Sequence, residues 1–514
     1  MATAEQFAQT ITNGYTFKGE HAALGAAILN GVVQPQCVVN LPLKTMNRHG
    51  LIAGATGTGK TKTLQVISEI LSNNSVPVLL MDIKGDLSGI AAEGTASTRL
   101  QERCTLLNID YKPAAYPVEF LTLSDEPGAK LRATVLEFGP ILLSKILALN
   151  DTQGGLLSIL FKYCDDNALL LLDLNDLIKV LQYAGEEGKA IIEKQYGKIS
   201  TTSLGTILRK VIELQQQGAD VFFGEPSFDV DDLMRISQDG KGMVNILRVT
   251  DMQAKPKLFS TFMLQLLAEL YATYPEEGDL EKPKLVLFID EAHLLFNEAS
   301  QALLDQLETV IKLIRSKGIG IFFCTQNPQD IPANILGQLG LKVQHALRAF
   351  TAADRKTIKQ AAENFPISEF YTTDELLTQM GIGEAFVTLL NEKGIPTPLV
   401  HTMLYPPTSR MDILAPAEID ALLAKSKLVK KYNISINSDS AYEALERKIN
   451  AQAPIEQQEE AATPSQKAKK EESFLDNPMV KQAGRTAAAI LTRTLLGALG
   501  LTGTSKRKKS GWFS

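Results

Sequence analysis

The sequence has 514 residues, of which 45% are hydrophobic and 21% are charged. Its 36 glycines and 22 prolines are close to the globular average, which excludes a collagen-like or largely disordered chain. The formal net charge of -6 conceals an asymmetry, because residues 464–514 carry ten Lys or Arg against three acidic residues, a net of +7. Residues 1–463 therefore sum to -13, and an acidic body with a basic tail is the first feature of the chain.

The cysteines and the apolar stretches indicate the cellular compartment. Cys37, Cys104, Cys164 and Cys324 lie far apart and form no CxxC pair, which argues against a zinc site or a disulfide framework. The first residues lack the basic start and apolar stretch of a signal peptide, and no run approaches 18 uncharged apolar residues. We therefore expect a soluble, cytoplasmic protein without a transmembrane segment.

In chain order, residues 1–37 are expected to form a short N-terminal segment, and short apolar stretches then alternate with helical ones. The expected strands are Val38–Leu41, His49–Ala53, Val76–Met81, Leu285–Ile289, Ile319–Cys324 and Lys342–Leu347, and the expected helices are Lys62–Asn73, Leu258–Tyr274 and Ala299–Lys317. Several strands are apolar on both faces, as strands covered by helices on two sides should be. This alternation predicts an α/β fold with a mostly parallel, doubly wound sheet.

The alternation is interrupted by a leucine-rich stretch with helical spacing. We expect a helical insertion at residues 126–218, which divides an α/β core into residues 38–125 and 219–405. C-terminal helices are expected at 406–452, a polar linker at 453–475 and a basic amphipathic tail at 476–514. The tail could dock on its own protein or contact a polyanion, and its last basic cluster fits polyanion contact and simple solvation equally.

The strongest motif is Gly-Ala-Thr-Gly-Thr-Gly-Lys-Thr at residues 54–61, between an expected strand and an expected helix. Glycines let backbone N–H groups close around phosphates, and the helix N-terminus favours an anion. Lys60 is expected to reach the β- and γ-phosphates of ATP, and the Thr61 hydroxyl to bind Mg²⁺. The expected phosphate-binding residues are Gly54, Ala55, Thr56, Gly57, Thr58, Gly59, Lys60, Thr61 and Lys62.

The second motif places two carboxylates, Asp290 and Glu291, directly after the apolar strand Leu285–Ile289. Ligands collect at this end of the strands in open α/β sheets. Asp290 is suited to hold Mg²⁺, and Glu291 is suited to activate the attacking water as a catalytic residue. The alternative is an acidic pair that only caps the next helix. His293 could couple the site to a bound polymer or simply pack.

Two further strand ends carry candidate catalytic residues. Gln326 follows the strand Ile319–Cys324, and its amide could sense the γ-phosphate or orient water, although it could also only form a turn before Asn327. Asp82 ends the strand after the phosphate-loop helix and begins Asp-Ile-Lys-Gly-Asp. We expect Asp82 to support catalysis or the metal rather than only to shape a turn.

Together these motifs resemble the HerA/FtsK superfamily of ring-forming P-loop ATPases, and more narrowly the bacterial HerA-like ATPases. The resemblance is carried by residues 47–61, 81–86, 288–293, 314–318 and 324–326, in family order, and covers about residues 15–405. It implies a RecA-like core, a homo-hexameric ring, and hydrolysis of ATP with Mg²⁺ at subunit interfaces. An arginine from the neighbouring subunit would enter each site. Arg315 matches that position and Arg348 is a second candidate, whereas the plain alternative for Arg315 is a helix-end arginine that offsets the helix dipole.

The resemblance leaves the substrate open. HerA proteins carry an N-terminal β-barrel, whereas only about 40 residues precede the core here. We expect a DNA translocase or helicase, and the alternative is a coupling ATPase that acts on a protein partner during transport or assembly. A small-molecule kinase is disfavoured, because Asp290 beside Glu291 supplies a hydrolytic base.

Overall fold

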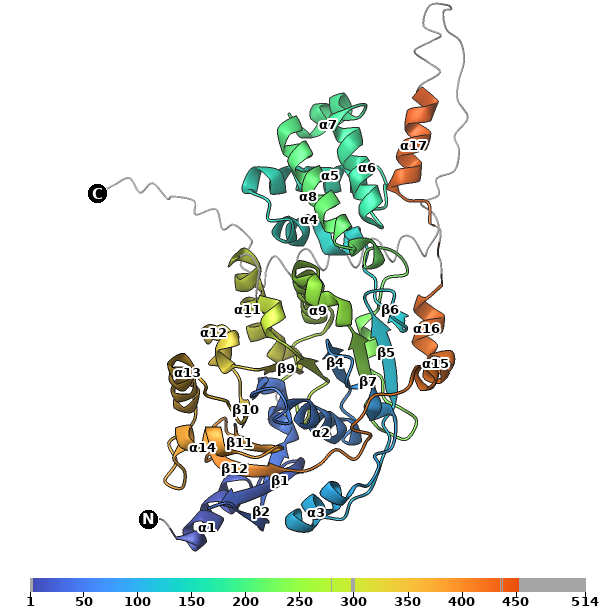
Figure 1. The fold of residues 1–514 in the computed structure, drawn as a ribbon. Coiled ribbons are helices and arrows are strands. Elements are labelled where there is room, and N and C mark those ends of the chain that lie inside the picture. The colour runs from blue at the N-terminus through green and yellow to red at the C-terminus, as the bar shows by residue number, and fades with distance from the viewer. Residues whose placement is uncertain (1–2, 279, 297–300, 435, 437, 453–514) are drawn as a thin grey trace, which may run out of the picture.

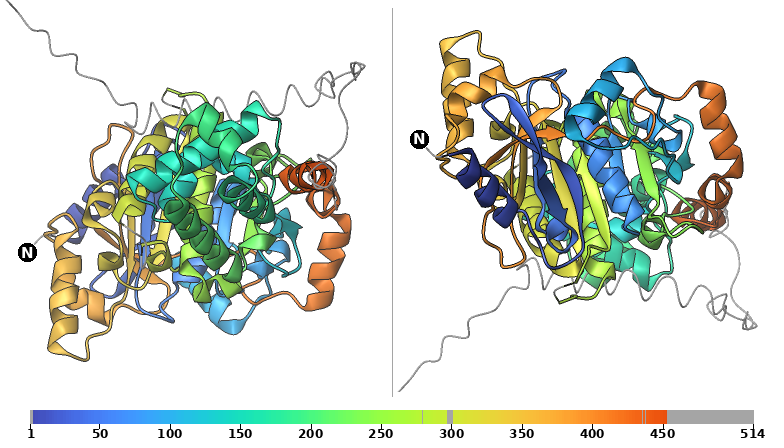
Figure 2. Two further views of the ribbon diagram at one scale, coloured as in Figure 1. Left: turned by 90° about the horizontal axis from the view of Figure 1, so that it is seen from above. Right: turned by 90° about the horizontal axis from the view of Figure 1, so that it is seen from below.

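The computed structural model describes residues 3–278, 280–296, 301–434, 436 and 438–452. Within these residues, the chain folds into one twelve-stranded sheet with helices on both faces (Figures 1 and 2). The strands are β1 (His21–Leu29), β2 (Val32–Pro42), β3 (Gly50–Ala53), β4 (Val78–Asp82), β5 (Val118–Thr122), β6 (Ala129–Lys130), β7 (Val244–Arg248), β8 (Leu285–Ile289), β9 (Ile319–Thr325), β10 (Leu341–His345), β11 (Glu384–Leu389) and β12 (Val400–Leu404).

The helices of the described residues lie before, between and after these strands, and five of them, α4 to α8, follow one another. They are α1 (Ala4–Gly14), α2 (Lys60–Asn73), α3 (Thr98–Leu107), α4 (Val135–Ile146), α5 (Asp151–Asp166), α6 (Leu174–Gly185), α7 (Lys189–Tyr196), α8 (Thr201–Gln216), α9 (Pro256–Thr273), α10 (His293–Phe296), α11 (Gln301–Ile314), α12 (Ala333–Leu336), α13 (Ala352–Glu363), α14 (Thr373–Gln379), α15 (Pro416–Lys425), α16 (Lys427–Tyr432) and α17 (Ala441–Gln452). A 3₁₀ turn, Arg315–Lys317, extends α11.

The sheet has the order β2-β1-β12-β11-β10-β3-β9-β8-β4-β7-β5-β6. Strands from β10 to β6 pair in parallel, whereas β10, β11, β12, β1 and β2 pair antiparallel in succession. The prediction of a mostly parallel α/β sheet is therefore confirmed. The antiparallel part was not predicted, and β2 begins six residues before the strand expected at Val38, inside the segment 1–37.

Alternation along each central strand divides the core between the two faces of the sheet. Leu79 and Met81 of β4 face one hydrophobic cluster with α9 and α11, whereas Val78 and Leu80 face a second cluster with α2. All five residues of β8 are buried, as a strand covered on both sides requires. The carboxyl ends of the parallel strands, which we call the carboxyl edge, therefore lie between two helical layers.

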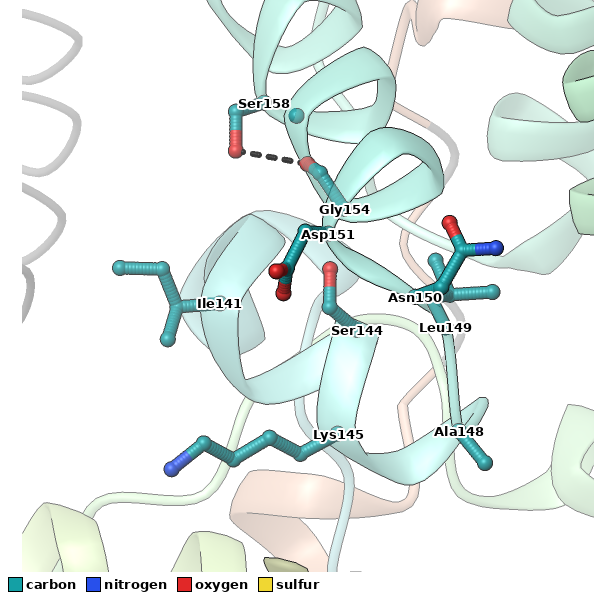
Figure 3. Close-up of a pocket in the computed structure, with 10 residues that line it drawn as sticks. Ile141, Ser144, Lys145, Ala148, Leu149, Asn150, Asp151, Gly154 and Ser158 are labelled. Carbon is teal, nitrogen blue, oxygen red and sulfur yellow. Dashed lines mark hydrogen bonds between the residues drawn. The ribbon is translucent and has the colours of Figure 1, made fainter.

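Helices α4 to α8 form an insertion between β6 and β7, drawn in teal and green at the top of Figure 1. Capping boxes begin three of them, with Thr134 and Glu137 at α4, Asn150 and Gln153 at α5, and Asp173 and Asp176 at α6. Their apolar faces continue the cluster that covers the α9 side of the sheet. A pocket of about 550 Å³ lies where α4 meets the start of α5, away from the phosphate loop (Figure 3).

After β12 the chain crosses the phosphate-loop helix α2 as residues 405–415, which we call the strap. Glu69 on α2 accepts hydrogen bonds from the backbone and hydroxyl of both Thr408 and Ser409, at 2.5–3.1 Å. Burial raises the pKa of Glu69, although these donors oppose the shift. Beyond the strap, α16 packs beside β6 and α17 beside α6. The predicted linker and basic tail, residues 453–514, lie outside the described residues.

None of the helices in the described ranges combines the length and the apolar character needed to cross a membrane. All four cysteines are buried and unpaired.

Candidate active site

The phosphate loop joins β3 to α2 at the carboxyl edge. Gly54 has φ +151°, and a Cβ atom there would lie 2.5 Å from Cβ of His345, so both its conformation and its surroundings require glycine. Gly59 has φ +114° and precedes the first helical residue, Lys60. The Lys60 amine donates to the carbonyl oxygens of Gly54 and Ala55 at 2.7 and 3.2 Å, and burial lowers its pKa. This is the closed, glycine-bounded loop that the motif predicts.

Residues near the ends of β10 and β11, together with Arg103 of α3, support the loop and the start of α2. Gly383, before β11, donates its backbone N–H to the carbonyl oxygen of Thr58 at 2.9 Å, and Arg103 of α3 donates to the carbonyl oxygen of Gly383 at 2.6 Å. His345, fully buried at the end of β10, lies 2.8 Å from the Thr63 hydroxyl. Burial lowers the pKa of His345 to about 3, so this ring is neutral across the physiological range.

Asp290 and Glu291 follow β8 at the same edge, two strands from β3. Both are buried, and Asp290 Oδ2 has no hydrogen-bond partner among the described residues. Burial raises the pKa of Asp290 to about 6. Glu291 has φ +45°, a strained conformation for a residue with a side chain. Such strain gathers at functional sites, because the surrounding structure must hold the residue in place.

A lysine occupies the space beside these carboxylates. Lys84, in the turn after β4, places its amine 2.5 Å from Glu291 Oε1 and 3.9 Å from Asp290 Oδ2. Burial opposes the charge of Lys84, but Asp290 and Glu291 outweigh it and raise the pKa of the amine. The other oxygen of Glu291, Oε2, lies 3.3 Å from Nδ1 of His293. His293 thus contacts the acidic pair rather than packing in the core.

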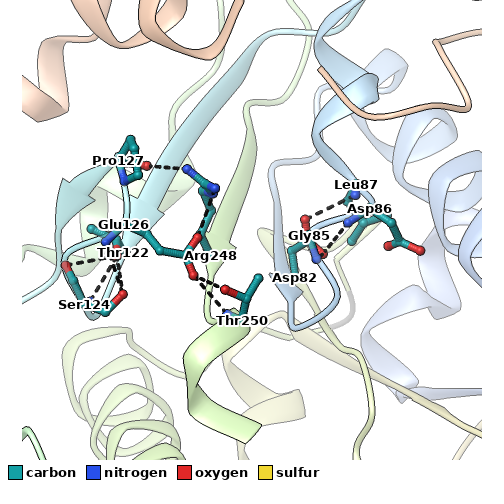
Figure 4. Close-up of polar contacts among 10 residues, drawn as sticks. All are labelled: Asp82, Gly85, Asp86, Leu87, Thr122, Ser124, Glu126, Pro127, Arg248 and Thr250. Atoms are coloured by element: carbon teal, nitrogen blue, oxygen red, sulfur yellow. Dashed lines mark hydrogen bonds and ion pairs between the residues drawn. The ribbon is translucent and has the colours of Figure 1, made fainter. Parts of the chain in front are cut away.

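The turn that carries Lys84 is organised by Asp82 (Figure 4). The Asp82 carboxylate accepts the backbone N–H groups of Gly85, Asp86 and Leu87 at 2.7, 3.1 and 3.2 Å. Burial raises the pKa of Asp82 to about 6. The Asp82 carboxylate thus holds the turn that carries Lys84, and its role in catalysis or in support of the metal stays a prediction. Farther along the carboxyl edge, Arg248 and Glu126 form an ion pair at 3.0 Å (Figure 4).

Gln326 and Lys62 both adjoin the loop, because Gly54 donates its N–H to the carbonyl oxygen of Thr325 and Lys62 follows Thr61 in α2. Gln326 follows β9, which pairs with both β3 and β8, and it is exposed at the carboxyl edge. Lys62 directs its amine to the carbonyl oxygen of Met411 in the strap and to Gln65 Oε1, 3.3 Å away. Gln326 therefore follows the strand next to the one that carries the acidic pair, whereas the Lys62 side chain binds the strap beside the loop.

The two candidate arginines lie at opposite edges of the sheet. Arg315 is exposed after α11, just before β9 begins. This is the amino edge, the side of the sheet at which the parallel strands start. The seven residues of β9 separate it from the phosphate loop by roughly 20 Å. Arg348 is exposed after β10 at the carboxyl edge, where Ala346 accepts the N–H of Ala55 at 2.9 Å. Arg348 thus lies near its own loop, and Arg315 lies far from it.

His49 connects α11 to β9 at the amino edge, near Arg315. Its Nδ1 accepts the N–H of Ile321 at 3.0 Å, and its Nε2 lies 2.8 Å from the carbonyl oxygen of Ile311 at the end of α11. Burial, which is complete here, lowers the pKa of His49 from 6.5 to about 4. The unfolded chain therefore binds more protons than the folded chain between these pH values.

Consequently, the free energy of unfolding should be independent of His49 above pH 6.5 and should fall as the pH drops toward 4. The loss is about 3 kcal/mol at its limit. His49→Gln keeps an acceptor and a donor but does not titrate. We expect the stability advantage of the wild type over His49→Gln to shrink by about 2 kcal/mol between pH 7.5 and 4.5 in urea unfolding. A pH-independent difference would show that His49 is not buried in its neutral form.

Sequence reasoning missed several of these contacts. Lys84 stands within the expected Asp-Ile-Lys-Gly-Asp segment, but its partner Glu291 is 207 positions away in the chain. His345 and Gly383, which support the loop from β10 and β11, belong to no motif in the sequence. The position of Lys84 directly after a strand end, between two carboxylates, was the one signal that could have identified it.

Comparison with known proteins agrees with this architecture. The sequence matches the family described as Helicase HerA-like C-terminal over residues 29–505. It is 23% identical over 352 residues to the DNA double-strand break repair helicase HerA of Sulfurisphaera tokodaii, covering 68% of this chain and 64% of that protein. The HerA of Saccharolobus solfataricus is 20% identical over 367 residues, covering 71% of this chain and 66% of that protein. The chain thus spans about two thirds of the length of these relatives.

Solved structures share the fold. The unbound bacterial conjugative coupling protein TrwBdeltaN70 superposes with a TM-score of 0.51 and 14% identity, covering 80% of this chain and 94% of that chain. TrwB in complex with ADP and Mg²⁺ gives a TM-score of 0.50 and 14% identity, covering 78% and 97%. The family match extends over most of the sequence and includes every motif on which the resemblance to HerA-like ATPases rests. The chain therefore belongs to the HerA-like helicase C-terminal family.

Proposed function

We propose that this protein is an ATP-hydrolysing motor of the HerA/FtsK type that acts on DNA. The observation that carries the proposal is the grouping of the phosphate loop, Gln326 and the Asp290–Glu291 pair at the ends of the successive strands β3, β9 and β8. A phosphate cradle, an amide and a buried acidic pair at one sheet edge are the groups that nucleotide hydrolysis requires. TrwB, which shares this fold, has been solved with ADP and Mg²⁺.

Each residue has a role that its position supports. The loop and the Lys60 amine bind the β- and γ-phosphates, and Glu291 takes a proton from the water that attacks the γ-phosphorus atom. ADP leaves with the electron pair of the broken bond. Gln326 orients the water or contacts the γ-phosphate, because its amide both donates and accepts hydrogen bonds. Asp82 positions the turn that carries Lys84.

The site has a group suited to Mg²⁺. Asp290 Oδ2 is a buried oxygen without a hydrogen-bond partner in the described part of the chain, and such an oxygen is costly unless a cation or donor satisfies it. Mg²⁺ is usually held by one or two carboxylates together with substrate phosphates, so Asp290 and the Thr61 hydroxyl fit it. When bound, the ion would neutralise charge that develops on the phosphates.

The position of Arg315 supports a ring assembly. An arginine at the amino edge cannot reach the phosphate loop of its own subunit, but Arg315 is exposed on the surface, where a neighbouring subunit could approach it. We infer a closed homo-oligomeric ring, hexameric as in the superfamily, in which Arg315 completes the adjacent site. The DNA substrate is inferred from family membership and from the two relatives named as DNA double-strand break repair helicases.

The test is the ATPase rate of the full chain with duplex DNA, single-stranded DNA or no DNA, each at 50 and 200 mM salt. We expect duplex DNA to raise the rate several-fold at low salt and much less at high salt, because phosphate contacts release counterions. Lys60→Ala is the control for the nucleotide site, since it should remove turnover under every condition.

The outcomes separate the two candidate functions. If neither form of DNA changes the rate at either salt concentration, the DNA part of the proposal is wrong. Stimulation by a co-purifying protein instead of DNA would favour the coupling ATPase. No hydrolysis by the wild type in any condition would overturn the motor itself.

A further inference from the structure

We propose that Lys84 is a second catalytic lysine, which contacts the γ-phosphate of ATP and thereby releases Glu291 to activate water. This inference rests on the proposed ATPase function and adds a residue to that site. It starts from the ion pair between the Lys84 amine and Glu291 Oε1, at 2.5 Å, with Asp290 Oδ2 at 3.9 Å.

The distances around the Lys84 amine indicate where the γ-phosphate would lie. A general base acts on a proton within hydrogen-bond reach, so the water that Glu291 activates lies about 3 Å from its carboxylate. The γ-phosphorus atom must lie next to that water for in-line attack. The Lys84 amine is already 2.5 Å from Glu291 and also lies near Asp290, the residue that fits Mg²⁺. It therefore stands beside the place that the γ-phosphate must take.

The backbone holds Lys84 in this place. Asp82 accepts three consecutive N–H groups of the turn, and Gly85 provides the left-handed residue with φ +75°. Such a turn fixes the backbone while the lysine side chain remains one third exposed, and its four-carbon stem can move its amine by a few ångströms. The backbone of Lys84 is therefore held in place, whereas its charged amine can move.

Charge explains why the Lys84 amine would leave Glu291 for the γ-phosphate. While Lys84 pairs with Glu291, the ammonium occupies the space in front of Oε1, where the attacking water would have to lie. A γ-phosphate carries more negative charge than one carboxylate, so the amine would move toward it. Glu291 would then lose its counter-ion at the moment when a substrate is in place. Its proton-accepting oxygen would face the water rather than a cation.

The experiment measures binding as well as turnover, using the full chain. Dissociation constants for MgADP and for the Mg²⁺ complex of the β,γ-imido analogue of ATP are compared in the wild type, Lys84→Met and Lys84→Arg. Lys84→Met keeps the length of the stem but removes the charge. Lys112→Met is the matched control, because Lys112 is 84% exposed and its amine also lies beside a carboxylate, 3.9 Å from Asp110 Oδ2. Thermal unfolding of each variant shows whether it is folded.

If Lys84 contacts the γ-phosphate, Lys84→Met should bind the triphosphate analogue about tenfold more weakly than the wild type, whereas its affinity for ADP changes less than about twofold. Its kcat should fall about 100-fold, and Lys84→Arg should recover part of both losses. Lys112→Met should match the wild type.

Three results would overturn the inference. Equal weakening of ADP and of the triphosphate would place Lys84 away from the γ-phosphate. A higher kcat in Lys84→Met would make Lys84 only a restraint on Glu291. Unchanged binding and turnover in a folded variant would leave it no role. A wild type that binds both nucleotides but does not hydrolyse ATP refutes the ATPase proposal, yet the difference in affinity still tests Lys84.

Discussion

Replacing Glu291 with glutamine should lower the ATPase rate by about 10²- to 10⁴-fold, the usual contribution of a general base. Glutamine has nearly the same shape and meets the same backbone, with φ +45°, so the geometry of the strand end is kept. The change removes the charge that accepts the proton and pairs with Lys84. Nucleotide binding should remain, because the phosphate loop is unchanged.

The measurements are steady-state hydrolysis and the dissociation constant of the β,γ-imido analogue of ATP. Glu446→Gln is the matched control, since Glu446 is an acidic residue of α17 that pairs with Lys179 at 3.5 Å, far from the phosphate loop. A Glu291→Gln variant that retains more than a tenth of the wild-type rate would show that another group accepts the proton. His293, 3.3 Å from Glu291, would then be the first residue to examine.

The parallel part of the fold and the groups at its carboxyl edge could be predicted because each depends on a local pattern. β8 is five consecutive apolar residues followed directly by its two carboxylates, and β3 is followed directly by the phosphate loop. When a parallel sheet is predicted, such strand ends must meet at one edge. The proximity of Glu291 to the phosphate loop therefore required no long-range information.

The antiparallel part could not be read in the same way. β1 has the sequence His-Ala-Ala-Leu-Gly-Ala-Ala-Ile-Leu, and its alanines and glycine are poor strand formers. It is a strand because β12 and β2 pair with it on both sides, and at Gly25 a Cβ atom would lie 2.3 Å from the Met403 carbonyl oxygen. The Asn30-Gly31 turn, with φ of +51° and +76°, was the local signal for this hairpin.

The contacts of Asp82 and Lys84 could not be predicted from the sequence, for a different reason. Both residues follow β4, so the sequence places both at the carboxyl edge. Which of them faces the acidic pair depends on how the turn folds, and three backbone N–H groups draw the Asp82 carboxylate inward while Lys84 extends toward Glu291. A sequence pattern gives the residue at a strand end but not the direction of its side chain.

Replacing Arg315 with alanine should lower hydrolysis about 10³-fold if this arginine completes the neighbouring subunit's site, because a positive fork on the γ-phosphate contributes factors of that size. Arg447→Ala is the matched control, an exposed arginine of α17 that pairs with Asp439 at 2.6 Å. Arg348→Ala tests the second candidate, which lies at the carboxyl edge of its own subunit. If Arg348→Ala shows the large loss and Arg315→Ala does not, the arginine acts within one subunit.

Mixing subunits distinguishes an arginine that acts between subunits from one that supports its own fold. Arg315→Ala subunits keep Glu291, and Glu291→Gln subunits keep Arg315, so an interface that joins the two in the right order contains both groups. In rings assembled from equal amounts, about a quarter of the interfaces are complete. We expect the mixture to hydrolyse ATP well above either variant alone, at up to about a quarter of the wild-type rate.

The position of Arg315 makes this result specific. It lies roughly 20 Å from its own phosphate loop across β9, so restored activity could come only from a second subunit. If the mixture is no more active than its components, although it co-assembles, Arg315 acts through its own subunit. The contact between His49 and Ile311 beside it would then explain the loss of activity as a local disturbance of the amino edge.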